Sequence, residues 1–150
     1  MVTLSPKNLL GAAFALLLLA GPAFPQSLFH RAENNVQVAL VKVERTAAYT
    51  EIQLQTQKAM NGVCWYASGP NSPFLVAAGE HYRYVSGDNI TACPGKQNYA
   101  NQEIMTLRFE PLPAETKTFS LVEGEGGENQ MINRKSSSET FWNFVGIKLD

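Results

Sequence analysis

Hydrophobic and polar residues alternate most regularly over positions 105–110. The apolar positions of this segment are Met105, Leu107 and Phe109. A period of two is typical of a β-strand that has one buried face and one solvated face. The Pro-Leu-Pro sequence at 111–113 removes two backbone donors and ends the strand, and the alternation resumes at Phe119. The pattern therefore predicts two consecutive strands joined by a proline-containing turn.

Further short segments with strand-like sequences are separated by Gly, Pro, Asn and Ser residues. They cover residues 36–43, 49–56, 63–67, 74–78, 81–85 and 140–149. We expect a turn over Lys58–Gly62 and a loop over Pro94–Gln102. Gly79-Glu80 has the spacing of a two-residue type II′ hairpin, with Gly in the first central position. Seven or eight short strands with frequent turn residues predict an all-β fold, and we expect an antiparallel β-sandwich.

The last predicted strand contains a change of parity. Trp142 and Phe144 share one face, whereas Ile147 and Leu149 fall on the other face of a regular strand. One extra residue at Val145-Gly146 would bring all four side chains to the same side, and glycine in a strand commonly marks such a bulge. We therefore predict a bulge here and a core that contains Phe109, Phe119, Trp142 and Phe144.

Residues 1–23 have the pattern of a secretory signal peptide. Lys7 supplies the positive charge, Leu9–Ala20 is apolar, and Gly21 and Ala23 are the small residues of a cleavage site. The alternative is a transmembrane anchor, but this apolar run of 12 residues is shorter than the roughly 20 that span a bilayer. We expect cleavage after Ala23, no stable membrane anchor afterwards, and a secreted or periplasmic protein. Residues 24–35 are then a flexible lead-in, and 36–150 form the domain.

Export to an oxidising compartment changes how the two cysteines are interpreted. Cys64 and Cys93 are the only cysteines, so one intramolecular disulfide is expected. The alternatives are a metal site, which needs further ligands nearby, and a reactive thiol, which needs an activating base such as His81. The disulfide is the prediction that we adopt.

Charge and the remaining polar motifs exclude several functions and leave others open. The chain has 12 basic and 13 acidic residues without a basic cluster, which argues against a nucleic-acid partner. Neither His30 nor His81 lies near a Gly-x-Ser-x-Gly turn, so no catalytic residue is predicted. Glu123–Glu128 is interpreted as a solvated acidic loop, with a cation site as the alternative. No cofactor or metal site is predicted, and Asn89-Ile90-Thr91 matches the N-glycosylation pattern.

Aromatic side chains are the remaining candidates for ligand binding. Exposed Tyr and Trp residues stack on sugars or anchor a protein partner, although in a domain of this size most aromatic residues belong to the core. The candidate binding aromatics are Trp65, Tyr66, Tyr82 and Tyr84.

The segment 107–113, the positions Thr116 to Gly124 and the terminal Phe-Val-Gly-Ile at 144–147 resemble a group of uncharacterised, signal-bearing bacterial β-sandwich domains of immunoglobulin-like type. The resemblance implies the fold and bacterial export, and it implies no activity. We expect a non-enzymatic binding or interaction module with a protein or carbohydrate partner in the bacterial envelope. The alternative is a small secreted hydrolase or hydrolase inhibitor whose site is built from loops.

Overall fold

A computed structural model describes residues 24–31, 37–123 and 142–150. These residues form antiparallel β-strands and contain no helix, which confirms the predicted all-β class. No helix among them could cross a membrane. The strands are β1 (Phe24–Arg31), β2 (Val38–Arg45), β3 (Thr50–Thr56), β4 (Met60–Val63), β5 (Pro73–Ala77), β6 (Glu80–Asp88), β7 (Gln97–Tyr99), β8 (Ile104–Phe109), β9 (Thr118–Glu123) and β10 (Phe144–Lys148).

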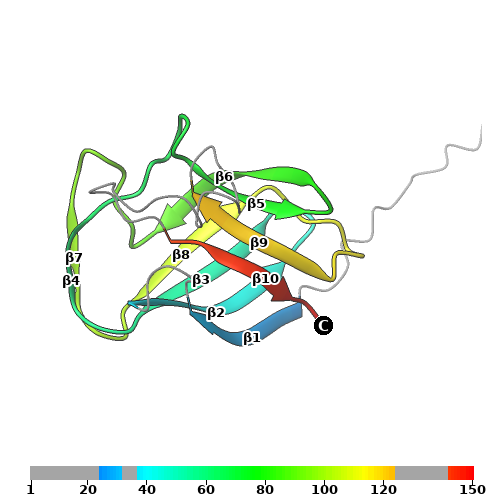
Figure 1. Cartoon of the computed structure of the whole chain (residues 1–150), viewed down its shortest axis with the longest axis horizontal. Helices are drawn as coiled ribbons and strands as arrows, with labels where there is room; N and C mark the ends of the chain where they lie inside the picture. The colour runs from blue at the N-terminus through cyan, green and yellow to red at the C-terminus, as the bar shows by residue number, and fades with distance from the viewer. Residues whose placement is uncertain (1–23, 32–36, 124–141) are drawn as a thin grey trace, which may run out of the picture.

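Eight strands form one curled sheet in the order β1-β2-β3-β8-β6-β5-β9-β10 (Figure 1). β4 and β7 form a separate two-stranded ribbon at one end of the molecule. In the central strands β3 and β8, buried and half-buried residues alternate along the whole strand, as the sequence pattern predicts. The strand that contains Met105, Leu107 and Phe109 therefore lies in the middle of the fold.

Strand β6 connects the two halves of the curled sheet, which are β1-β2-β3-β8 and β5-β9-β10. Its first residues pair with β5, from Glu80 to Arg83, and its later residues pair with β8, from Tyr84 to Asp88. The register shifts between Tyr84 and Ser86, where the strand bends. A Cβ at Gly87 would lie 2.9 Å from the backbone oxygen of Thr106, so β6 can approach β8 this closely only with glycine.

The two halves of the curled sheet enclose one core. β9 and β10 cross in front of β2, β3 and β8 in the view of Figure 1, and residues from both halves belong to the same buried cluster. The largest fully buried side chains are Trp65, Phe109, Phe119 and Phe144, and Trp142 packs with them. The predicted core of Phe109, Phe119, Trp142 and Phe144 is confirmed.

The predicted bulge in the last strand is also confirmed. Phe144 pairs with Leu121 and Ile147 pairs with Phe119, so two residues of β10 lie opposite one residue of β9. Gly146 adopts a φ of 66° at this point, a conformation that glycine tolerates and other residues rarely adopt. The bulge brings the side chains of Trp142, Phe144, Ile147 and Leu149 into the core.

The edges of the sheet, β1 and β10, approach each other without a backbone ladder. The side-chain amide of Gln26 donates to the carbonyl oxygen of Lys148 over 3.3 Å and accepts from the backbone N–H of Asp150 over 3.1 Å. The Gln26 side chain thus links β1 to the end of β10 in place of backbone pairing between the two edge strands. The predicted lead-in over 24–35 is wrong for its first eight residues, because they form β1 and pair with β2.

Three further local predictions need correction. The segment Lys58–Gly62 contains the start of β4, and Pro94–Gln102 contains β7. The hairpin between β5 and β6 turns at Ala78-Gly79 rather than at Gly79-Glu80. Both turn residues have positive φ, 49° and 81°, which is the type I′ geometry and not type II′.

Candidate functional site

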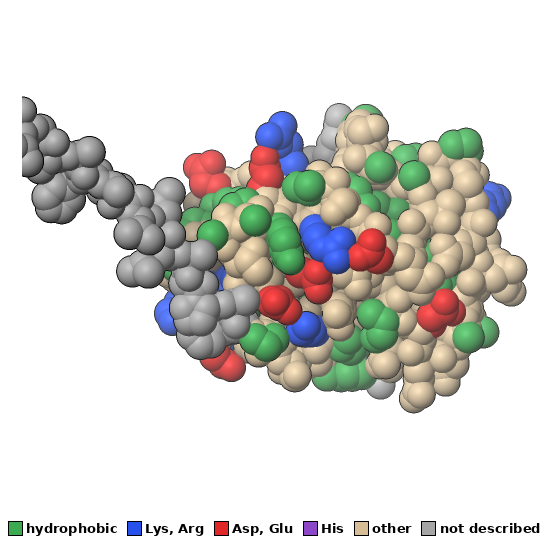
Figure 2. Space-filling model, turned by 180° about the vertical axis from the view of Figure 1, so that it is seen from behind, with side chains coloured by type: hydrophobic (Ala, Val, Ile, Leu, Met, Phe, Trp, Pro, Cys, Tyr) green, Lys and Arg blue, Asp and Glu red, His purple; other side chains and the backbone are tan. Residues whose placement is uncertain are grey.

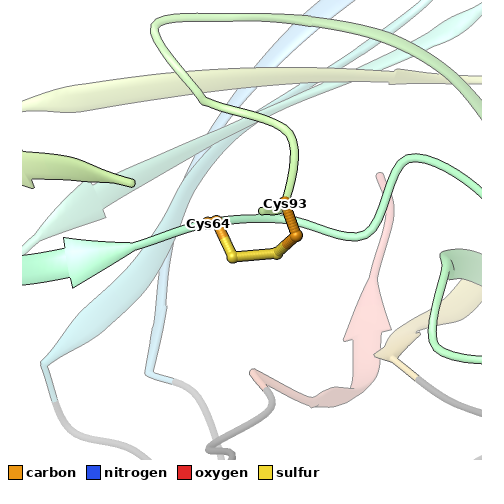
Figure 3. Close-up of a disulfide and its surroundings, with 2 residues drawn as sticks. All are labelled: Cys64 and Cys93. Atoms are coloured by element: carbon orange, nitrogen blue, oxygen red, sulfur yellow. A yellow bond between two sulfur atoms is a disulfide. The ribbon is translucent and has the colours of Figure 1, made fainter. Parts of the chain in front are cut away.

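The disulfide between Cys64 and Cys93 fixes the base of the β4–β7 ribbon (Figure 3). Their Cα atoms lie 5.0 Å apart, within the range that a disulfide requires. Trp65 donates its N–H to Thr91, and Cys93 donates its N–H to Trp65, so two backbone hydrogen bonds flank the bridge. The predicted disulfide is confirmed. Because both sulfur atoms are bonded to each other, neither serves as a thiolate or as a metal ligand.

The four aromatic residues predicted for binding lie in different environments. Trp65 is 2 % exposed and packs against Tyr84 and Trp142, with ring centroids 6.3 Å and 5.9 Å away. Tyr82 and Tyr84 are half-buried against the core, and Tyr66 is half-buried as well. Trp65 is therefore a core residue that a ligand does not reach. Of the four, Tyr84 lines the surface groove described next.

This groove lies between the breaker sequence at 67–72 and the β5–β6 hairpin. Its volume is about 510 Å³, within the range of small-molecule sites. The chain folds in this way because Gly69, with φ 85°, turns the loop and Pro73 begins β5. The groove is lined by Ala67, Ser68, Gly69, Pro70, Ser72, Pro73, Phe74, His81, Arg83 and Tyr84.

Two rings from the hairpin stack on each other at the groove. Phe74 on β5 and His81 on β6 stack with centroids 4.5 Å apart and planes inclined by 26°. The pair arises because both residues lie on the outward face, next to a cross-strand pairing of Val76 with His81. Each ring covers one face of the other. His81 is exposed and Phe74 is half-buried, so the outer face of the His81 ring is the more accessible part of the pair.

Arg83 is held beside this surface by Glu110. The Arg83 Nε and Nη2 groups donate to Glu110 Oε1 over 3.0 Å and 2.6 Å, and the Arg83 backbone N–H donates to Glu110 Oε2 over 2.9 Å. Glu110 in turn donates its backbone N–H to the carbonyl oxygen of Arg83. These hydrogen bonds raise the pKa of Arg83 and lower the pKa of Glu110. The guanidinium is therefore oriented, although its side chain is 83 % exposed.

Only one edge of the Arg83 guanidinium is engaged. Glu110 occupies the edge formed by Nε and Nη2, and among residues 24–31, 37–123 and 142–150 no acceptor faces Nη1. The opposite edge, formed by Nη1 and Nη2, is thus presented to solvent as a pair of parallel donors. Such an edge matches the two oxygens of a carboxylate.

Several charges elsewhere on the surface are paired with charges of opposite sign. Figure 2 shows acidic and basic side chains interspersed on one face of the molecule. Arg108 binds both Glu51 and Asp88, over 2.9 Å and 2.7 Å, and lies 5.8 Å from the Tyr49 ring centroid. The face shown has no stripe of one sign.

Asn89 lies in the glycosylation motif but acts as a structural residue. Its Nδ2 group donates to Glu103 Oε1 over 3.1 Å and to the Ile104 carbonyl oxygen over 2.8 Å, and its Oδ1 accepts from Gln97 over 2.7 Å. The Tyr99 hydroxyl also donates to the Asn89 carbonyl oxygen. Nδ2 is the atom that a glycan would modify, and both of its hydrogens are already used, so modification would break at least one of the hydrogen bonds to Glu103 and Ile104.

Glu123 differs most from its sequence interpretation. It was expected in a solvated acidic loop, yet it ends β9 and is 6 % exposed. Its Oε2 accepts the backbone N–H of Trp142 over 2.8 Å, and burial raises its pKa to about 8. Positions 124–128 of the predicted acidic loop lie outside the described residues. Within the described part of the chain, no group of three or more His, Cys, Asp or Glu side chains is arranged to hold a metal ion.

Searches against protein-family models, curated proteins and solved structures find no match to this chain. The candidate site therefore rests on geometry alone. Sequence reasoning missed Phe74, Arg83 and Glu110 as site residues, and it considered His81 only as a catalytic base, an alternative that it did not adopt. The signal that could have found them is the Ser-Gly-Pro-Asn-Ser-Pro sequence at 68–73 directly before an aromatic strand, because such a loop tends to leave the following outward face uncovered.

Proposed function

We propose that the protein is an exported, non-enzymatic binding module of the bacterial envelope and that the groove at 67–84 binds its ligand. The observation that carries the proposal is the combination of an exposed His81 ring, stacked on Phe74, with a guanidinium that is both oriented and solvent-accessible. A binding site needs an apolar surface and a few polar groups at fixed positions, and this groove provides both. Preorganised side chains lose little entropy when a ligand binds.

Export is part of the same proposal. A disulfide is compatible with an oxidising compartment, and the signal-like sequence over 1–23 would deliver the chain there. The proposed immunoglobulin-like sandwich is supported by the curled antiparallel sheet, in which β6 pairs with both halves. Small sandwich domains commonly bind ligands with the loops at the ends of their strands, and the loop 67–72 directly precedes β5.

The alternative of a hydrolase finds no support at this groove. His81 is the only general-base candidate among the lining residues, and its ring stacks on Phe74. Ser68 and Ser72 supply hydroxyl groups, but neither is hydrogen-bonded to His81, and none of the lining residues is a carboxylate that could orient the imidazole. Binding without chemistry is therefore the function that the geometry favours.

The test compares the mature protein with a groove variant and a matched surface variant. The double variant Phe74→Ser/His81→Ser removes the ring stack, and Val85→Ser removes a 62 % exposed apolar side chain from the same strand outside the groove. Each protein is immobilised, and the retention of separated protein and glycan fractions of the envelope is quantified. We expect retention of one fraction to fall about tenfold in the groove variant and to remain unchanged in Val85→Ser. Equal retention by all three proteins would refute the groove as the binding site.

A further inference from the structure

The groove has a charge preference that identifies a class of ligand. Its lining includes Arg83 and His81 and no acidic residue. Glu110 lies behind Arg83 and engages the guanidinium edge next to Nε, so it orients the cation without occupying the free edge. A ligand that approaches this free edge therefore meets paired donors and no carboxylate in the groove lining.

The geometry points to an acidic sugar, a pyranose ring that carries a carboxylate, as the ligand of this groove; the inference rests on the proposed binding function. The carboxylate would accept from Nη1 and Nη2 of Arg83 in the bidentate manner that planar guanidinium and carboxylate groups favour. The sugar ring would lie on the outer face of His81, which Phe74 supports from behind, because the C–H face of a pyranose is apolar enough to pack on an aromatic face.

The other lining residues fit a ring with hydroxyl groups. Ser68 and Ser72 place two hydroxyl-bearing side chains on the loop side, and hydroxyls both donate and accept. Pro70 and Pro73 add rigid apolar walls. A volume of about 510 Å³ accommodates a ligand of one or two sugar rings. An acidic peptide would share the carboxylate contact but would make less use of the outer face of His81.

The experiment uses three probes and follows the signals of the mature protein by NMR. The probes are methyl glucuronoside, methyl glucoside and a hexapeptide of Asp and Gly. The first two differ only at C6, which is a carboxylate in the glucuronoside and a hydroxymethyl group in the glucoside. We expect the glucuronoside to bind at least about tenfold more tightly than either other probe, and to shift signals of Phe74 and His81. Raising the salt concentration should weaken binding, since Arg83 is exposed.

Three variants separate the charge of Arg83 from its geometry. Arg83→Gln should abolish the preference for the glucuronoside over the glucoside. Arg83→Lys keeps the charge without the planar edge and should restore only part of that preference. Lys117→Gln removes an exposed cation outside the groove and should leave all affinities unchanged.

Each remaining outcome decides between the two proposals. Equal affinity for the two sugars, or tighter binding of the peptide, would overturn the acidic-sugar inference. Failure of both sugars to bind would also overturn it, whereas the binding function would stand if envelope retention still depended on Phe74 and His81. If retention did not depend on these residues, the binding function itself would fail.

Discussion

The buried carboxyl group of Glu123 predicts an unusual dependence of stability on pH. Its pKa is raised from 4.5 to about 8, first because burial disfavours the charged form, while the hydrogen bond from Trp142 acts in the opposite direction. The folded protein therefore keeps this proton at pH values where the unfolded chain has lost it. The contribution of neutral Glu123 to the free energy of unfolding is fully present below about pH 4.5. It decreases as the pH rises from there, and it is lost above about pH 8.

The size of the loss follows from the difference between the two pKa values. Each pKa unit corresponds to about 1.4 kcal/mol, so ionising Glu123 in the folded state costs on the order of 5 kcal/mol at most. This is comparable with the total stability of a small domain, about 5 to 15 kcal/mol. Glu123→Gln retains an oxygen that can accept the Trp142 N–H and carries no charge at any pH. The variant should match the wild type near pH 4.5 and be several kcal/mol more stable at pH 8.5.

Urea unfolding followed by far-UV circular dichroism at pH 4.5, 6.5 and 8.5 measures this difference. With a slope of about 2 kcal/mol per M, the midpoints of the wild type and Glu123→Gln should separate by roughly 1 to 2 M at pH 8.5. Glu115→Gln is the matched control, because Glu115 is exposed, and its profile should follow the wild type. Parallel profiles for the wild type and Glu123→Gln would show that Glu123 is not buried as a neutral acid.

Three further changes test the packing and the covalent frame. Phe109→Ala should lower the free energy of unfolding by about 3 to 5 kcal/mol, because Phe109 is fully buried; an unchanged urea midpoint would contradict its place in the core. Cys64→Ala/Cys93→Ala should cost about 2 to 5 kcal/mol, and thiol titration of the unreduced wild type should find no free thiol. Gly146→Val should cost about 1 to 2 kcal/mol by calorimetry, since its φ of 66° disfavours a β-branched residue.

The features that the sequence predicts correctly depend on local patterns. Successive side chains in a strand point to opposite faces, so residue position predicts side-chain direction. The alternation at 105–110 therefore predicts one buried face, and the parity change at 142–149 predicts a bulge. The disulfide was predictable because only one intramolecular pairing of Cys64 with Cys93 exists. No long-range information is needed for any of these predictions.

The features that were missed depend on contacts between distant segments. β1 has no clear alternation, and it becomes a strand because β2 supplies its hydrogen-bond partners. β7 has two polar residues, Gln97 and Asn98, before the buried Tyr99, and Gln97 donates a hydrogen bond to Asn89. Glu123 looks solvated beside its glycines, yet its burial is a property of the folded chain. Sequence periodicity carries none of this information.

The candidate site shows the same limit. Arg83 and Glu110 are 27 residues apart and meet because β6 and β8 pair in a register that places Tyr84 opposite Phe109. In the β5–β6 hairpin, His81 stacks on Phe74 only because the turn lies at Ala78-Gly79. A turn one residue later would change which residues of β5 and β6 lie opposite each other. The groove thus depends on the register of two strand pairs. A change that shifts either register should remove the binding surface while leaving every groove residue in the sequence.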